Sequence, residues 1–228
     1  MGTEHHPVDA KTAAGSPRPC HHAAVAGERA DLSNLLAGID WAGPADEYWP
    51  SHAGTQALLH GLATDDPQSV TLGLSHLWTA FIEYPNVFPP AAPAVRYVLA
   101  LLHLQPNVEM VIRSPSGRLR PLRAHLLTWL WAAANAVSDV NEREFVELAG
   151  YSPLAYPSSV WHTIRQLRPR MYDTAAAFLD DPHPGVRQEA IAAAVVLVRV
   201  PELAVHRQRI AAAARDFLDA CTDPMRRR

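Results

Sequence analysis

Apolar side chains recur every three or four positions along most of this 228-residue chain, which is the spacing of helices with one buried face. Alternation of apolar and polar residues, typical of strands, is nearly absent. The pattern therefore predicts an all-α fold in which amphipathic helices pack through their apolar faces. The clearest apolar stripe comprises Val70, Leu74, Leu77, Trp78 and Phe81.

Prolines, glycines and aspartates divide this pattern into separate helices. Asp31 and Thr55 can each cap the first turn of a helix through a side-chain oxygen. Pro169 either begins a helix or kinks a long one, and Gly150 ends a shorter helix. The expected helices cover approximately residues 31–42, 55–62, 67–81, 93–104, 122–137, 141–149, 158–179, 182–197 and 203–218.

Residues 105–121 interrupt the helical pattern. Val108, Met110 and Ile112 alternate with polar residues, and the turn-forming segment 114–117 follows them. The segment predicts a small β-hairpin or an extended loop that projects from the helices.

The two ends of the chain differ from its middle. Residues 1–30 are rich in His, Ala, Pro and Gly without periodicity, which predicts a disordered N-terminal tail. Residues 31–221 form the expected helical domain, and residues 222–228 form a basic C-terminal tail.

Two segments of similar sequence join one expected helix to the next. Asp65-Asp66-Pro67 and Asp180-Asp181-Pro182 each combine an aspartate that can accept hydrogen bonds from a new helix with a proline that ends the old one. Such a turn folds two helices into an antiparallel hairpin. The segments start 115 residues apart, from 65 to 180, which fits about three units of the ~40-residue HEAT-type period.

The segment 181–190 resembles the HEAT repeat, whose typical unit carries an Asp-Pro turn followed by Val-Arg and then Ala. The resemblance implies a short HEAT-like solenoid, an α-α superhelix, in which Asp181 caps a helix and Arg187 pairs along the ladder. In the first copy Thr71 stands where the arginine should be, and residues 77–102 look like a group of HEAT-like proteins from actinomycete bacteria. The expected structural turn and cap residues are Asp66, Pro67, Asp181, Pro182 and Arg187.

The resemblance implies a concave surface that binds a partner, most often another protein. Some relatives of this architecture are toxin-neutralising immunity proteins, lyase-like chromophore factors or DNA-repair glycosylases. Because one fold supports many functions, fold alone cannot choose among them.

Catalytic signatures are missing from the sequence. No nucleophile elbow, phosphate-binding glycine loop or Cys-His signature is present. The helical histidines lack the spacing and adjacent glutamate of a zinc site, so we expect no metal and no cofactor. These are His76, His103, His125 and His162. The interpretation favoured here is a non-catalytic protein-binding module, with toxin neutralisation as a special case.

Positive charge is concentrated in the second half of the chain. Residues 1–110 carry 4 basic and 11 acidic side chains, whereas residues 111–228 carry 16 and 12, which together give the net charge of −3. An acidic protein partner would suit the arginines, and nucleic acid is the alternative ligand. The candidate partner-binding residues are Arg113, Arg118, Arg120, Arg123, Arg165 and Arg168.

The chain has no evident export or membrane segment. Cys20 and Cys221 lie near opposite ends, so a structural disulfide is not expected. The first thirty residues lack an apolar signal region, and the longest apolar run, residues 191–198, is far shorter than the ~20 residues of a membrane span. We therefore expect a cytoplasmic protein without a membrane partner.

Overall fold

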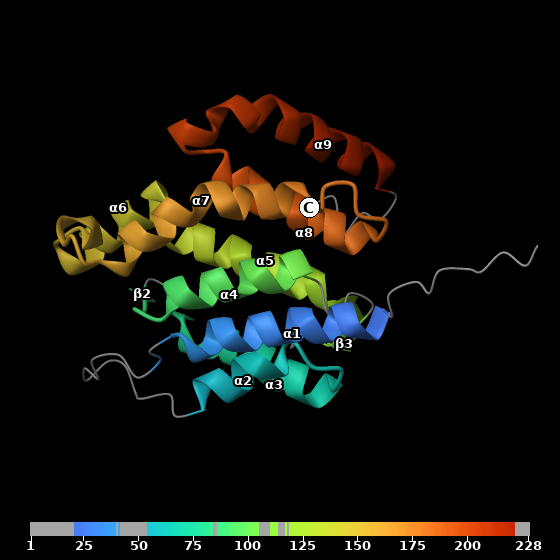
Figure 1. Ribbon diagram of the computed structural model, residues 1–228. Helices are drawn as coiled ribbons and strands as arrows, with labels where there is room; N and C mark the ends of the chain where they lie inside the picture. The colour runs from blue at the N-terminus through green and yellow to red at the C-terminus, as the bar shows by residue number, and fades with distance from the viewer. Residues whose placement is uncertain are drawn as a thin grey trace, which may run out of the picture.

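The computed structural model describes residues 21–39, 41, 54–83, 86–104, 110–113, 117 and 119–221. These residues are mostly helical, and two short antiparallel strand pairs accompany the helices (Figure 1). The predicted all-α class with a small β-hairpin is confirmed. No helix in these ranges is both long and apolar enough to cross a membrane.

The elements follow one another along the chain as helices interrupted by two hairpins and two 3₁₀ turns. The helices are α1 (His21–Ala37), α2 (Thr55–Gly61), α3 (Pro67–Ala80), α4 (Ala91–Leu104), α5 (Leu122–Ala136), α6 (Asp139–Ala149), α7 (Val160–Ala176), α8 (Pro184–Leu197) and α9 (Arg207–Ala220). The strands are β1 (Ile82–Glu83), β2 (Asn86–Val87), β3 (Val111–Arg113) and β4 (Leu119–Pro121), and the 3₁₀ helices are η1 (Pro153–Ala155) and η2 (Pro201–His206).

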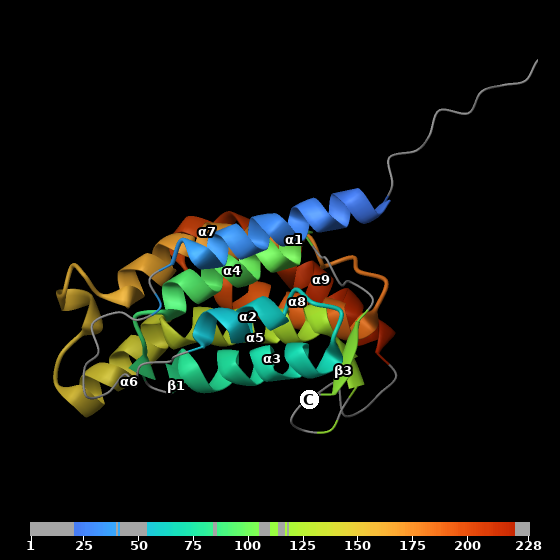
Figure 2. The same cartoon turned by 60° about the horizontal axis from the view of Figure 1, so that its bottom comes forward.

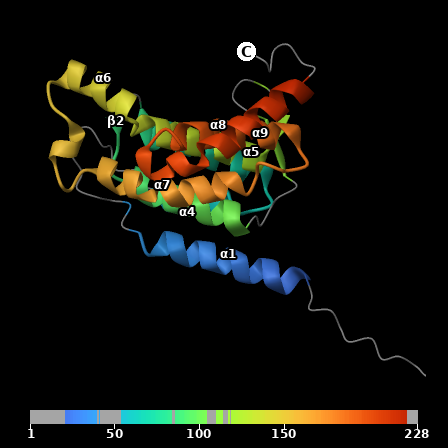
Figure 3. The ribbon, with the colours of Figure 1, turned by 90° about the horizontal axis from the view of Figure 1, so that it is seen from above.

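The helices stack in two layers. Helix α4 packs beside α7 in one layer, while α5 packs beside α3 and α8 in the other (Figure 2). Helix α1 contacts α2 and α4, and α9 packs on α8. Figure 3 shows α1 running alongside α4. Consecutive helices also pack on each other in the pairs α2–α3, α4–α5 and α7–α8. The result is a stack of helical hairpins in which each pair covers the apolar face of the next.

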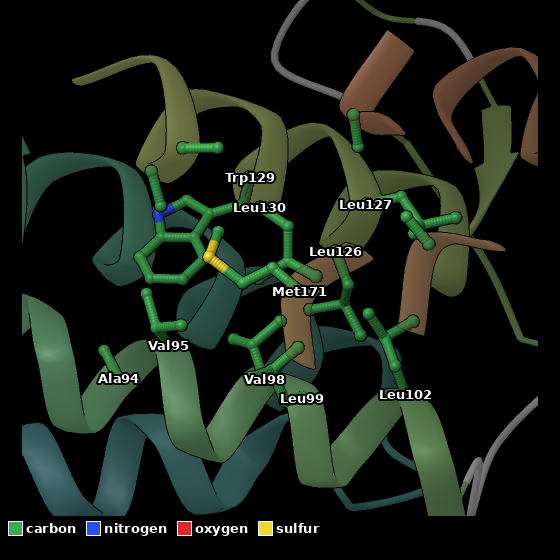
Figure 4. Packing of buried hydrophobic residues seen from close by; sticks show 14 of the residues in the cluster. Ala94, Val95, Val98, Leu99, Leu102, Leu126, Leu127, Trp129, Leu130 and Met171 are labelled. Atoms are coloured by element: carbon green, nitrogen blue, oxygen red, sulfur yellow. The ribbon is translucent and has the colours of Figure 1, made fainter. Parts of the chain in front are cut away.

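The core runs continuously between the layers. Side chains from α4, α5 and α7 meet there, among them Val98, Leu130 and Met171 (Figure 4). Val70 and Val186, which follow the two Asp-Pro turns, are fully buried. The apolar stripe of α3 therefore points inward as predicted, with the exception of Trp78, which is 36% exposed.

Two buried polar groups join neighbouring hairpins. The indole N–H of Trp129 in α5 donates to the carbonyl oxygen of Leu77 in α3 at 2.9 Å. The hydroxyl of Tyr97 in α4 donates to the carbonyl oxygen of Leu59 in α2, also at 2.9 Å, and burial raises the pKa of Tyr97. Each large ring thus keeps its polar atom hydrogen-bonded while its apolar surface is buried.

Helices α2 and α3 approach each other at two glycines. A Cβ atom added to Gly73 would lie 2.6 Å from the carbonyl oxygen of Leu58, and one added to Gly61 would lie 2.8 Å from that of Ser69. Both distances are shorter than van der Waals contact allows. The backbones of this hairpin therefore touch, and only glycine fits at these positions.

The two Asp-Pro turns have different capping residues. Asp66 caps α3, as predicted, because its carboxylate accepts from the amides of Gln68 and Ser69 and Pro67 begins the helix. Hydrogen bonds from Ser69 and Gln68 lower the pKa of Asp66.

In the second copy the cap is His183, whose imidazole accepts from the amide of Gly185. The expectation that Asp181 caps this helix is wrong because Pro182 and His183 separate Asp181 from Pro184, the first residue of the helix. Asp181 instead accepts from the amide of His183 and shapes the turn. Arg187 does not pair along a ladder of side chains; its guanidinium donates to the carbonyl oxygens of Asp181 and Pro182.

Two expected boundaries also change, and of the two alternatives for Pro169 the structure has the long helix. Helix α1 begins at His21, so residues 21–30 belong to a helix and the predicted tail is wrong over that range; its alanines favour helix. Thr55 is the first residue of α2 and hydrogen-bonds His76, so it does not cap the helix. Pro169 lies inside a continuous α7. The predictions for residues 1–20 and for the tail 222–228 fall outside the described residues.

The predicted hairpin within residues 105–121 is confirmed by the antiparallel pairing of β3 with β4. The pairing of β1 with β2 was not predicted, because each strand contributes only two residues and leaves no readable alternation.

Candidate functional site

Helix α6 departs from the stacking of its neighbours. Ser138 caps its first turn, and Gly150 ends it in the left-handed conformation with φ of 77°. Asn141 is the only one of its residues that is buried. Val146 and Leu148 are 38% and 74% exposed. The helix therefore adds little to the core and leaves apolar surface open beside the stack.

A cleft of about 550 Å³ lies against this helix. Its walls come from α6, from the segment that leads through η1 into α7, and from the β1–β2 hairpin with the residues after it. The lining residues include the aromatic side chains Phe88, Phe145, Tyr151, Tyr156 and Trp161. We refer to this feature as the aromatic cleft.

The aromatic rings form a continuous series from the core to the surface. Trp161 is buried and meets Phe145 with ring centroids 5.9 Å apart. Phe145 meets Tyr151 at 5.5 Å, and Tyr151 meets Tyr156 at 5.8 Å, all in edge-to-face geometry. Tyr151 and Tyr156 are 47% and 56% exposed. Buried rings thus hold exposed ones in place, which provides a rigid surface for an apolar ligand.

The polar part of the aromatic cleft is small. Glu83 of β1 is the one charged side chain among its described lining residues. Ser159 also lines it and caps α7 by accepting from the amide of Trp161. Flat rings beside a carboxylate suit a ligand that combines an apolar body with a positive charge.

The first group of predicted partner-binding arginines lies on the hairpin β3–β4 and at the start of α5. Arg113 is exposed and donates to the carbonyl oxygen of Gly117 at 2.7 Å, while Arg118 falls outside the described residues. Arg120 forms an ion pair with Glu189 of α8, and Arg123 forms one with Asp181 at 2.9 Å. Arg120 therefore joins β4 to α8, and Arg123 joins α5 to the turn before α8.

The second group lies in α7. Arg165 pairs with Asp139 at 3.1 Å and with Glu142 at 3.0 Å, which ties α7 to α6. Arg168 is only 5% exposed and donates to the carbonyl oxygen of Val137 at 2.7 Å. Burial, and then the nearby charge of Arg165, lower the pKa of Arg168. Neither group of arginines lines the aromatic cleft.

The histidines of the helices serve local packing. His125 is buried and donates through Nε2 to the carbonyl oxygen of Ile112, and burial lowers its pKa. His162 hydrogen-bonds the carbonyl oxygen of Leu154. Among the residues that the structure describes, no three histidine, cysteine or acidic side chains gather as metal ligands would.

The sequence analysis missed the aromatic cleft, although a signal was present. Four aromatic residues that form its walls lie between positions 145 and 161, whereas aromatic residues make up 7% of the whole chain. Their spacing of five or six residues fits neither a helix face nor a strand, so a search for periodicity passes over it.

Comparison with protein-family models, with curated proteins and with solved structures finds no match.

Proposed function

We propose that this chain is a non-catalytic, HEAT-like binding protein that captures an extended segment of a partner protein in the aromatic cleft. The observation that carries the proposal is the series of packed rings that ends in two half-exposed tyrosines. It lies where α6 interrupts the stacked hairpins, and residues that depart from a regular scaffold commonly carry function.

The apolar surface extends beyond the cleft. Leu148 follows Phe145 by one helical turn, so both lie on the same side of α6, and Leu148 is 74% exposed. An exposed apolar surface of this kind is typical of a protein interface, whereas small-molecule sites enclose most of their ligand. This favours a polypeptide as the ligand.

The charge of the cleft favours a basic segment. Glu83 lines it, and a lysine or arginine of the partner would lie near both this carboxylate and the rings. Prolines in the partner would add to binding because an extended proline-rich segment docks on aromatic grooves with little loss of entropy. The sequence suggested an acidic partner instead, but that expectation depended on arginines of which Arg120, Arg123 and Arg165 form internal ion pairs.

Two other hypotheses for the function follow from the same HEAT-like resemblance. Toxin neutralisation is a special case of partner capture and would place the toxin's contact segment in the aromatic cleft. A nucleic-acid ligand would need a row of cations along its phosphates, and internal ion pairs occupy Arg120, Arg123 and Arg165, three of the six arginines expected to contact it. Binding to duplex DNA that weakens steeply between low and moderate salt would revive that alternative.

Selection of random peptides displayed on phage tests the proposal directly. The full chain should enrich peptides that combine prolines with lysine or arginine, and the double variant Tyr151→Ala, Tyr156→Ala should retain none of them. Trp78→Ala is the control, because Trp78 is an aromatic residue of α3 that is 36% exposed and does not line the cleft. Selected peptides that bind the double variant as well as the unmodified chain would refute capture in the cleft.

A further inference from the structure

A second cavity lies against α6 and has a different lining. Its volume is about 230 Å³, and it is formed by the end of α5, the first turns of α6, the middle of α7 and the end of α8. Three arginines from three different parts of the chain line it, namely Arg143, Arg168 and Arg199. We refer to it as the arginine cavity.

These three arginines differ from Arg120, Arg123 and Arg165 in their charge partners. Arg120, Arg123 and Arg165 each form an ion pair with a carboxylate. Within the described part of the chain, the three arginines of the cavity form none. A guanidinium carries five N–H donors. Arg168, which is 5% exposed, uses one of its donors on Val137, and Arg143 uses its Nε on the carbonyl oxygen of Asp139.

The free carbonyl oxygens at the ends of α5 and α8 accept hydrogen bonds from arginines, but not from all three arginines of the cavity. After α5, the carbonyl oxygen of Val137 accepts from Arg165 and Arg168. After α8, those of Val198 and Arg199 accept from Arg207. The side chains of Arg143 and Arg199 are therefore not required to satisfy these positions.

Acidic groups near the cavity are fewer than the cations. Asp139 is the one carboxylate among the described lining residues, and it is already paired with Arg165. Glu142 and Glu202 act on Arg168 only through longer-range attraction, and Glu142 is also paired with Arg165. The first turn of α6 adds the amides of Asp139 and Val140, which have no acceptor within the helix and favour an anion.

We propose that the arginine cavity binds a phosphate monoester group, held by Arg143, Arg168 and Arg199. Guanidinium groups bind phosphate oxygens in pairs, and a phosphate monoester carries close to two negative charges at neutral pH. Its charge can balance two of the three cations, of which Arg143 and Arg199 are exposed and Arg168 is buried, whereas a single carboxylate offers half of that charge and two oxygens. Burial of Arg168 excludes water from one side of the group and strengthens the contact.

Isothermal titration calorimetry of the full chain with inorganic phosphate tests this inference, with phosphoserine and acetate titrated in parallel at constant ionic strength. We expect saturable binding of phosphate and phosphoserine and at least tenfold weaker binding of acetate. Arg199→Gln and Arg143→Gln should each weaken phosphate binding at least tenfold. Arg96→Gln, an exposed arginine of α4, should leave it unchanged.

Several results would overturn the inference. The first is that phosphate gives no saturable heat, and the second is that acetate binds as tightly as phosphate. The third is that the Arg199→Gln and Arg96→Gln variants bind phosphate with the same affinity. Circular dichroism of each variant establishes that the helices are intact. Arg168→Lys provides a second measurement at the buried position: it keeps the charge but loses the paired donors, so it should weaken phosphate binding without removing it. Peptide capture by the aromatic cleft does not depend on any of these outcomes.

Discussion

Helices α5 and α6 are adjacent in the chain, yet they contribute to the molecule in opposite ways. Helix α5 has 15 residues and buries ten of them, whereas α6 has 11 residues and buries only Asn141. Burial of apolar surface is the main source of folding free energy, so α5 stabilises the stack. Helix α6 instead exposes side chains and walls both cavities. The comparison separates a part of the chain that maintains the fold from a part available for ligands.

The largest expected effect comes from a substitution in α5 that tests how much this helix stabilises the fold. Trp129→Ala removes a fully buried ring and its hydrogen bond to Leu77, so it should lower the free energy of unfolding by about 3–5 kcal/mol. Chemical denaturation followed by circular dichroism measures the change. The matched variant in α6 is Phe145→Ala, which removes a partly buried ring and should cost less than half as much. Equal losses for the two variants would mean that α6 stabilises the fold as much as α5 does.

A smaller effect should follow from loss of the ion pair between α5 and the turn before α8. The side chains of Arg123 and Asp181 are 11% and 9% exposed, so Arg123→Met leaves a nearly buried carboxylate without its cation. We expect a loss of about 3 kcal/mol in the free energy of unfolding at neutral pH. Arg113→Met, on the exposed hairpin, should change it by no more than about 0.5 kcal/mol. If the two variants unfold alike, the Arg123 pair contributes nothing to the stack.

The smallest expected effect compares α6 with α7, a helix of the stack, through the same type of capping residue. Ser138 caps α6 and Ser159 caps α7, because each hydroxyl oxygen accepts one hydrogen bond from a backbone amide. Replacement of either by alanine removes about 1 kcal/mol from its helix. Ser159→Ala should lower global stability by that amount. Ser138→Ala should lower hydrogen-exchange protection within α6 while global unfolding hardly changes. Equal global losses would show that α6 unfolds together with the stack.

Local chemistry made most of the fold predictable. The apolar stripes of α3, α4, α5 and α8 have helical periodicity, and side chains such as Val70 and Val186 are buried as that periodicity requires. The hairpin at residues 111–121 was readable because three residues alternate before a turn. The capping role of Asp66 was predictable because a capping residue accepts from amides only two and three positions away.

The candidate sites could not be predicted in the same way, because they depend on contacts between distant elements. The cavity brings Arg143, Arg168 and Arg199 together from the region of three different helices, and their positions in sequence share no period. The predicted arginines do lie close together in the sequence. The carboxylates that pair with Arg120 and Arg123, however, lie 69 and 58 positions away. Such pairings become visible only when the helices are placed in space.

The contact between α2 and α3 has a consequence for how the chain can vary. Because Gly61 and Gly73 bring two backbones together, a smaller side chain nearby would not make room for a Cβ atom at either position. A methyl group at Gly73 would push the short α2 away from α3. This would also disturb α1, which packs on α2. The closest approach at both glycines is to a main-chain oxygen, so the spacing of α2 and α3 cannot adjust to a larger residue by side-chain repacking alone.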